Sequence, residues 1–233
     1  MAKGILLDFL GTVARPAGGD LGAVLREVRN LGYEVYGPEL QAAHEFVLRV
    51  EFPEKGYAGA EAFVEAVLKH LGHRPKRTEL MSLAPLLAEY HHFALYEDAE
   101  RVIPRLAKSW KVGVLSDLPW FVLSPVLEPF KGALAVITPK EAKAAPPHPE
   151  AFRAGAHTLG LRPKDITVVS ADHEDGLGVP KGLGFPTVHV RRAGRPPCPH
   201  AEVTIASLDE LEGVLKSSPP KTSPSAPALA GKT

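Results

Sequence analysis

Cysteine is almost absent from this chain, and neither sign of charge is in excess. The 233 residues contain one cysteine, Cys198, and 27 Lys and Arg residues balance 27 Asp and Glu residues. One cysteine excludes an intrachain disulfide and a metal cluster built from several thiolates of one chain. The balanced charge gives no indication that a nucleic acid or an anionic membrane is a partner.

Long apolar runs are also absent. No segment approaches the roughly 20 apolar residues that cross a bilayer. The sequence therefore predicts a cytoplasmic protein without a membrane partner. From residue 216 onwards the chain consists mainly of Ser, Pro, Ala, Lys and Thr. Because so little apolar surface cannot offset the entropy of ordering, we expect a disordered tail at 216–233.

Short apolar segments that end in polar turns recur along the chain. Helical sequence at 99–110 and 149–159 precedes two of them, as in a parallel sheet covered on both faces. The predicted strands are residues 4–7, 112–115, 133–137, 166–169 and 187–190, with a short edge strand at 204–205. The sequence therefore predicts an α/β fold with a doubly wound, Rossmann-like parallel sheet of about five strands.

About ninety residues separate the first predicted strand from the second, and their apolar side chains recur at helical spacing. One such set is Leu21, Val24, Leu25, Val28 and Leu31. A single crossover between parallel strands needs far fewer residues. We therefore predict a helical cap at 16–95, inserted into a discontinuous core of residues 1–15 and 96–215.

A carboxylate, Asp8, stands at the end of the first predicted strand, and the turn Gly11-Thr12 follows it closely. Open α/β sheets place their ligand sites at the carboxyl ends of the strands. Carboxylates held at such a site can form covalent aspartyl intermediates. Asp8 is therefore the predicted catalytic nucleophile.

Six segments follow one another in a fixed order along the chain. They are residues 8–13 (Asp-Phe-Leu-Gly-Thr-Val), the helical insertion, and residues 114–117, 147–152, 168–175 and 184–188. In this order and spacing they resemble the haloacid dehalogenase-like (HAD) superfamily of hydrolases. The resemblance runs from residue 4 to about residue 192. It implies a Rossmann-like core with a cap inserted after the first strand.

The resemblance also implies roles for individual residues. Asp8 would attack phosphorus, or carbon in the dehalogenase branch. Ser116, the second catalytic residue, would hydrogen-bond a phosphoryl or carboxylate oxygen of a small-molecule substrate. Backbone amides after Asp8 would bind the same oxygens. The substrate-binding residues that it implies are Phe9, Leu10, Gly11 and Asp117.

A Mg²⁺ ion is the cofactor that the resemblance implies. The ion would offset repulsion between the nucleophile and an anionic substrate. The implied ligands are Asp8, the backbone carbonyl of Leu10, Asp172 and Asp175. Because Gly176 and Pro180 depart from the last motif of the family, the sequence leaves open which of the last two aspartates binds the metal.

Leu10 is the first departure from the family pattern. The phosphatase branch has an aspartate there that protonates the leaving alcohol, and general acid catalysis contributes about 10²–10⁴-fold. The dehalogenase branch tolerates an apolar residue, because halide departs without a proton. His148 and His173, in loops expected at the same edge, are predicted alternatives for the acid. The dehalogenase branch also uses a cap arginine. Arg49 is the candidate for this role, but the favoured interpretation is a solvated arginine on a helix face.

The second departure is Pro146, which stands where the family has a lysine. Lys140 and Lys143 lie upstream and are the possible substitutes, although an exposed loop position is the favoured interpretation of each. Without a cation, Asp8 and the neighbouring carboxylates would raise one another's pKa.

Three functions remain open on this evidence. The first is a Mg²⁺-dependent phosphatase that acts on a small phosphorylated metabolite through an aspartyl nucleophile, with altered or weak acid–base chemistry. The second is a non-catalytic protein of the same fold that binds a ligand or partner, because three motifs are altered. The third is a 2-haloacid dehalogenase-like hydrolase. The sequence does not decide between a monomer and a homodimer.

Overall fold

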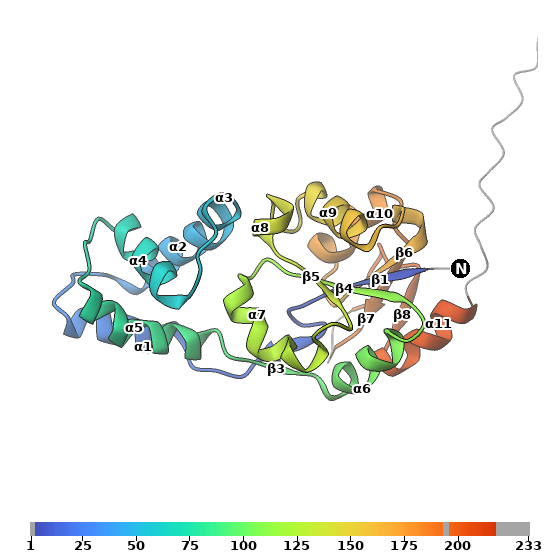
Figure 1. Cartoon of the computed structure of the whole chain (residues 1–233), viewed down its shortest axis with the longest axis horizontal. Helices are drawn as coiled ribbons and strands as arrows, with labels where there is room; N and C mark the ends of the chain where they lie inside the picture. Colours follow the sequence, from blue (N-terminus) through green and yellow to red (C-terminus); the bar gives the residue numbers. More distant parts are fainter. Residues whose placement is uncertain (1–2, 193–195, 218–233) are drawn as a thin grey trace, which may run out of the picture.

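The computed structural model describes residues 3–192 and 196–217 (Figure 1). Its centre is one sheet of six parallel strands in the spatial order β5-β4-β1-β6-β7-β8. The strands are β1 (Gly4–Asp8), β4 (Lys111–Leu115), β5 (Ala135–Ile137), β6 (Ile166–Ser170), β7 (Thr187–Val190) and β8 (Val203–Ile205). The chain adds β4 and β5 on one side of β1 and then returns to add β6, β7 and β8 on the other. This reversal makes the sheet doubly wound and places a ligand crevice at the carboxyl ends of β1 and β6.

Helices cover both faces of the sheet because successive side chains of each strand point to opposite faces. The helices are α6 (Glu97–Leu106), α7 (Trp120–Leu127), α8 (Pro139–Ala142), α9 (Pro149–Leu159), α10 (Val179–Gly182) and α11 (Leu211–Ser217), with helical turns η2 (Glu128–Phe130), η3 (Pro163–Asp165), η4 (Glu174–Gly178) and η5 (Leu208–Glu210). On β1, the buried side chains of Ile5 and Leu7 pack in one cluster with those of α6 and α11. Leu6, between them, packs in a second cluster with those of α9. No helix in the described part of the chain is long and apolar enough to cross a membrane.

The predicted α/β fold class with a doubly wound sheet is confirmed, with two corrections. The short edge strand predicted at 204–205 is β8, which pairs along β7 and completes the six-stranded sheet. The helix predicted at 99–110 is α6, which starts at an acidic first turn that favours a helix N-terminus and ends before the turn into β4. Residues 216 and 217 belong to α11 rather than to the predicted tail. The rest of that tail, 218–233, lies outside the described residues.

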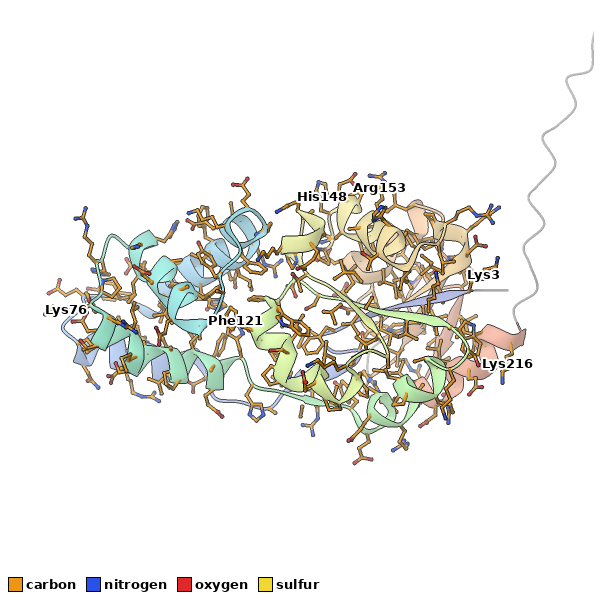
Figure 2. The ribbon with its side chains drawn as sticks, viewed as in Figure 1. Lys3, Lys76, Phe121, His148, Arg153 and Lys216 are labelled. Carbon is orange, nitrogen blue, oxygen red and sulfur yellow. The ribbon has the colours of Figure 1, made fainter. Side chains whose placement is uncertain are left out.

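The remaining helices form a separate layer, which we call the cap. They are α1 (Leu21–Asn30), α2 (Gly37–Phe46), the π-helical turn η1 (Val47–Glu51), α3 (Phe52–Lys55), α4 (Ala60–His70) and α5 (Arg77–Tyr90). Figure 1 shows the cap on the opposite side of the core from the N-terminus, and therefore towards the carboxyl end of β1. Phe121 of α7 lies between the two parts (Figure 2), with its ring 6.1 Å from that of Phe63 in α4. For these two parts we propose the division predicted above, a cap at 16–95 in a core of 1–15 and 96–215.

Both connections between core and cap run side by side. They are β2 (Ala14–Pro16) and β3 (Phe93–Leu95), which pair as an antiparallel ribbon. The ribbon continues into the cap, where the N–H of Gly18 donates to the carbonyl of His92 at 3.0 Å. A Cβ atom at Gly18 would lie 1.7 Å from the carbonyl oxygen of Glu89, so only glycine allows the two chains to approach this closely.

Candidate active site

A pocket of about 180 Å³ opens at the carboxyl ends of β1, β4 and β6, between the sheet and the cap. Four aspartates line it, which are Asp8, Asp117, Asp172 and Asp175. The cap contributes Arg49, the one cationic side chain among the described residues that line the pocket, and Leu10 and Phe152 form part of the apolar wall. The structure therefore brings together the carboxylates that the sequence predicts at this edge, because the ends of parallel strands meet there.

The carboxylate of Asp8 is held by two hydroxyl groups. The hydroxyl of Ser170 donates to Asp8 Oδ2 at 2.8 Å, and the hydroxyl of Thr12 donates to the same oxygen at 3.2 Å. Burial raises the pKa of Asp8 to about 7; the charge of Asp117 adds to the rise, and the two hydroxyl groups oppose it. Asp8 therefore changes its charge near neutral pH.

The turn after Asp8 is tightly folded. The N–H of Gly11 donates to the carbonyl of Ala14 at 2.7 Å, and Gly11 adopts a φ of +77°, which favours glycine. Phe9 is fully buried, with its ring edge-on to that of Phe93 at 5.6 Å between centroids. Of the three substrate-binding residues predicted in this turn, Leu10 is the one whose side chain lines the pocket, and 43% of its surface is exposed.

Strand β4 delivers Ser116 and Asp117 to the same edge of the sheet. Ser116 is buried, and its hydroxyl oxygen accepts the N–H of Leu118 at 3.1 Å. Asp117 lines the pocket. Burial raises the pKa of Asp117, and the guanidinium of Arg49 opposes that rise. Of these two residues, Asp117 is therefore the one that lines the pocket, and its charge acts on Asp8.

The end of β6 is connected directly to Asp8 by a hydrogen bond. The hydroxyl of Ser170, which donates to Asp8, also accepts the N–H of Asp172 at 2.9 Å. Asp172 Oδ1 accepts the N–H groups of Asp175 at 2.9 Å and Gly176 at 3.2 Å. A Cβ atom at Gly176 would lie 2.1 Å from the hydroxyl oxygen of Ser170, so glycine is required there. Ser170 lies within the segment 168–175 that resembles the family but is not among the predicted site residues; the available signal is a hydroxyl residue that ends a buried strand.

The carboxylates of the pocket do not form a cluster of three metal-ligating side chains. Within residues 3–192 and 196–217, no group of three or more His, Cys, Asp or Glu side chains could hold an ion. Asp172 already uses one carboxylate oxygen for two backbone N–H groups, and Asp8 uses one for two hydroxyl groups. Mg²⁺ usually keeps several waters and is bound through one or two carboxylates. The Mg²⁺ site implied for Asp8, the Leu10 carbonyl, Asp172 and Asp175 therefore stays a prediction.

The lysines predicted as substitutes do not line the pocket. Pro146 forms part of its wall, at the position where the family has a lysine. Lys140 is exposed on α8, and its side chain extends towards the cap, where a Cβ atom at Gly56 would lie 2.8 Å from Lys140 Cδ. Lys143 is exposed and follows α8 with a φ of +56°. The cation supplied to the pocket is therefore the guanidinium of Arg49.

The two histidines predicted as substitute acids are engaged elsewhere. His148 is exposed before α9 (Figure 2), where its Nδ1 accepts the N–H of Glu150 at 3.2 Å and caps the helix. His173 packs edge-on to His189, with ring centroids 4.7 Å apart. Neither histidine lines the pocket.

Arg49 is the residue whose position the sequence predicts least well. It is exposed, as expected of a helix-face arginine, but it also lines the pocket and its charge acts on Asp117. Arg49 lies in η1, a π-helical turn whose wider winding departs from the 3.6-residue period used to assign helix faces. A cation from the cap therefore faces the aspartates of the core.

The fold matches solved structures of one superfamily. The 2-haloacid dehalogenase from Pseudomonas syringae pv. tomato DC3000 has a TM-score of 0.68 and 19% identity, over 93% of this chain and 99% of that one. The L-2-haloacid dehalogenase from Xanthobacter autotrophicus has a TM-score of 0.61 and 18% identity, over 94% and 100%. The HAD phosphatase from Thermococcus onnurineus has a TM-score of 0.56 and 20% identity, over 91% and 97%. Neither a protein-family model nor a curated protein sequence matches the chain. These likenesses establish that the chain has the HAD fold.

Proposed function

We propose that this chain is a hydrolase of the HAD superfamily that displaces halide from a small 2-halocarboxylate through an ester on Asp8. The observation that carries the proposal is the pair Leu10 and Arg49 in the pocket of Asp8. One is an apolar side chain at the position where a phosphatase needs an acid, and the other is a cation from the cap. The haloacid dehalogenases that share this fold support the same assignment.

Each part of the pair suits this substrate class. Halide leaves without taking a proton, so the leaving group needs no acid at Leu10. Leu10, Phe152 and Val168 offer an apolar wall to the halogen-bearing carbon. The substrate's carboxylate would repel the aspartates of the pocket, and the guanidinium of Arg49 offsets that repulsion and can bind a carboxylate through two N–H groups.

The reaction proceeds in two balanced steps. In the first, a carboxylate oxygen of Asp8 attacks the α-carbon, the carbon–halogen bond breaks, and halide leaves with the bonding electron pair. In the second, water adds to the carbonyl carbon of the ester and the acyl carbon–oxygen bond breaks. The oxygen of the water stays on Asp8, and one of its protons goes to the leaving oxygen of the 2-hydroxy acid. The other proton is taken by a neighbouring carboxylate, for which Asp172 and Asp175 line the pocket. Asp8 is then a carboxylate again.

The second candidate is the phosphatase that the sequence favours. The presence of Asp172 and Asp175 in the pocket of Asp8 favours it, as does the HAD phosphatase with the same fold. Mg²⁺ would have to draw these carboxylates together, and with Leu10 in place of an acid only activated leaving groups would depart quickly.

A direct assay separates the candidates. We expect the purified protein to release chloride from 2-chloropropionate without added metal, and with EDTA present. Hydrolysis of p-nitrophenyl phosphate that requires Mg²⁺, with no chloride release, would instead identify the phosphatase. Release of neither product would contradict both enzymatic proposals and leave the non-catalytic function.

Replacement of Arg49 by Ala is expected to lower kcat/KM for 2-chloropropionate by about 10- to 100-fold, the cost of losing one charge-assisted hydrogen bond. Arg49→Lys should recover part of the loss. Arg74→Ala removes an exposed cap arginine that does not line the pocket, and should leave kcat/KM unchanged. Equal effects of Arg49→Ala and Arg74→Ala would contradict a role for Arg49 in substrate binding.

A further inference from the structure

We propose that Arg192, which does not line the pocket, is a positioning residue that orients the nucleophile Asp8 through Thr12. The inference deepens the proposed function, since it takes Asp8 as the nucleophile. It rests on a continuous series of hydrogen bonds that begins after β7 and ends on the carboxylate of Asp8.

The guanidinium of Arg192 bridges two segments of the chain. Its Nη1 and Nη2 donate to the two carboxylate oxygens of Asp98, at 2.7 and 2.9 Å. Nη2 also donates to the backbone carbonyl of Thr12 at 2.6 Å. The guanidinium carbon lies 3.9 Å from the centre of the Tyr96 ring, a cation–π contact that fixes the plane of the group.

The counter-ion of Arg192 is itself rigidly held. Asp98 is buried and accepts the hydroxyl of Ser207 at 3.0 Å and the N–H of Leu208 at 2.8 Å. The attraction of Arg192 and these hydrogen bonds lower the pKa of Asp98 against the opposing effect of burial. Asp98 therefore stays charged at neutral pH and keeps the guanidinium oriented towards Thr12.

Thr12 transmits this position to the nucleophile. It is fully buried, and its hydroxyl oxygen accepts the N–H of Ala171 at 2.8 Å. That bond directs the hydroxyl hydrogen to the remaining partner, Asp8 Oδ2, at 3.2 Å. Hydrogen bonds thus hold both parts of Thr12, the backbone carbonyl through Arg192 and the side chain through Ala171 and Asp8. Loss of the Arg192 bond would leave a buried carbonyl without its donor and release the turn.

Arg192→Lys tests the idea, because an ammonium keeps the charge opposite Asp98 but cannot reproduce the planar fork. We expect kcat to fall by about 10- to 100-fold with KM within about twofold, since small misplacements of a reacting group cost that much. Thr12→Val should lower kcat by a similar factor, whereas Thr12→Ser should retain most of kcat. The double variant with Arg192→Lys and Thr12→Val should have a kcat close to that of Thr12→Val alone. Arg105→Lys alters a matched arginine–carboxylate pair, Arg105 with Glu212, away from the pocket and should leave kcat unchanged.

Three outcomes would overturn the proposal. They are a loss of thermal stability with unchanged kcat, a change in KM alone, and additive effects of Arg192→Lys and Thr12→Val on kcat.

If the wild-type protein turns over neither substrate, titration of the Asp8 carboxyl carbon by NMR replaces kinetics. Weakening the Thr12 bond should then move that titration to higher pH, and an unmoved titration would contradict the proposal. The other charged groups around Asp8, which are Arg49, Asp117, Asp172 and Asp175, are the same in every variant.

Discussion

Asp8→Asn is expected to abolish chloride release, with a loss on the order of 10⁴- to 10⁶-fold, as for removal of other catalytic nucleophiles. The amide keeps the size of the carboxyl group, but its oxygen cannot form the ester. The measurement is the rate of chloride release at saturating 2-chloropropionate, at a pH well above 7. A variant that retains more than a few per cent of the rate would show that the ester does not form on Asp8.

The same variant is expected to be more stable than the wild type at alkaline pH. The pKa of Asp8 is about 7 in the folded protein against its usual 3.8, because burial disfavours the charge. Between these values the folded state holds a proton that the unfolded state has lost, so the free energy of unfolding falls as pH rises from about 4 to 7. The loss reaches about 4 kcal/mol above pH 7, and Asn avoids it. Urea unfolding at pH 4 and pH 8 measures the difference; equal stability of the two proteins at pH 8 would contradict it.

Pro146→Lys is expected to increase activity at acid pH. Pro146 lines the pocket, so an ammonium there would lie among the carboxylates and favour the charged form of Asp8. An adjacent opposite charge should lower the midpoint of the pH–rate profile from about 7 to between about 4 and 6. At pH 5.5, where only a small fraction of Asp8 is charged in the wild type, the rate should then rise by about 8- to 30-fold.

Pro146→Ala is the matched control, because it removes the proline without adding a charge. It should leave the midpoint near 7. An identical midpoint in the Lys and Ala variants would mean that the ammonium does not reach Asp8, and an acid shift in the Ala variant would assign the effect to the backbone instead.

The carboxylates of the site were predictable from the sequence, and the cation was not. Asp8, Asp117 and Asp172 each follow an apolar strand, and the topology of a parallel sheet alone brings such residues together. Arg49 reaches the pocket through the packing of the cap on the core and through a π-helical turn. Both depend on contacts between residues far apart in the chain, which no local pattern reports.

Local capping explains why the substitutes proposed for the missing lysine and acid are placed elsewhere. Thr138 and Glu141 form a capping box with Pro139 in the first turn, so a short helix carries Lys140 away from the pocket. His148 accepts a backbone N–H at the start of α9 in the same way. Both signals are present in the sequence, but they place these side chains only once the helix boundaries are known.

The ribbon of β2 and β3 is the axis about which the cap could turn relative to the core. Both connections to the cap pass through it, and Phe93 within it contacts Phe9, the residue next to Asp8. A rotation about this ribbon would move Arg49 relative to the aspartates of the pocket while Asp8 stayed close to the axis. Under the proposed function, opening would leave the aspartates without this counter-charge and favour release of an anionic product, and closure would restore the guanidinium for the next carboxylate.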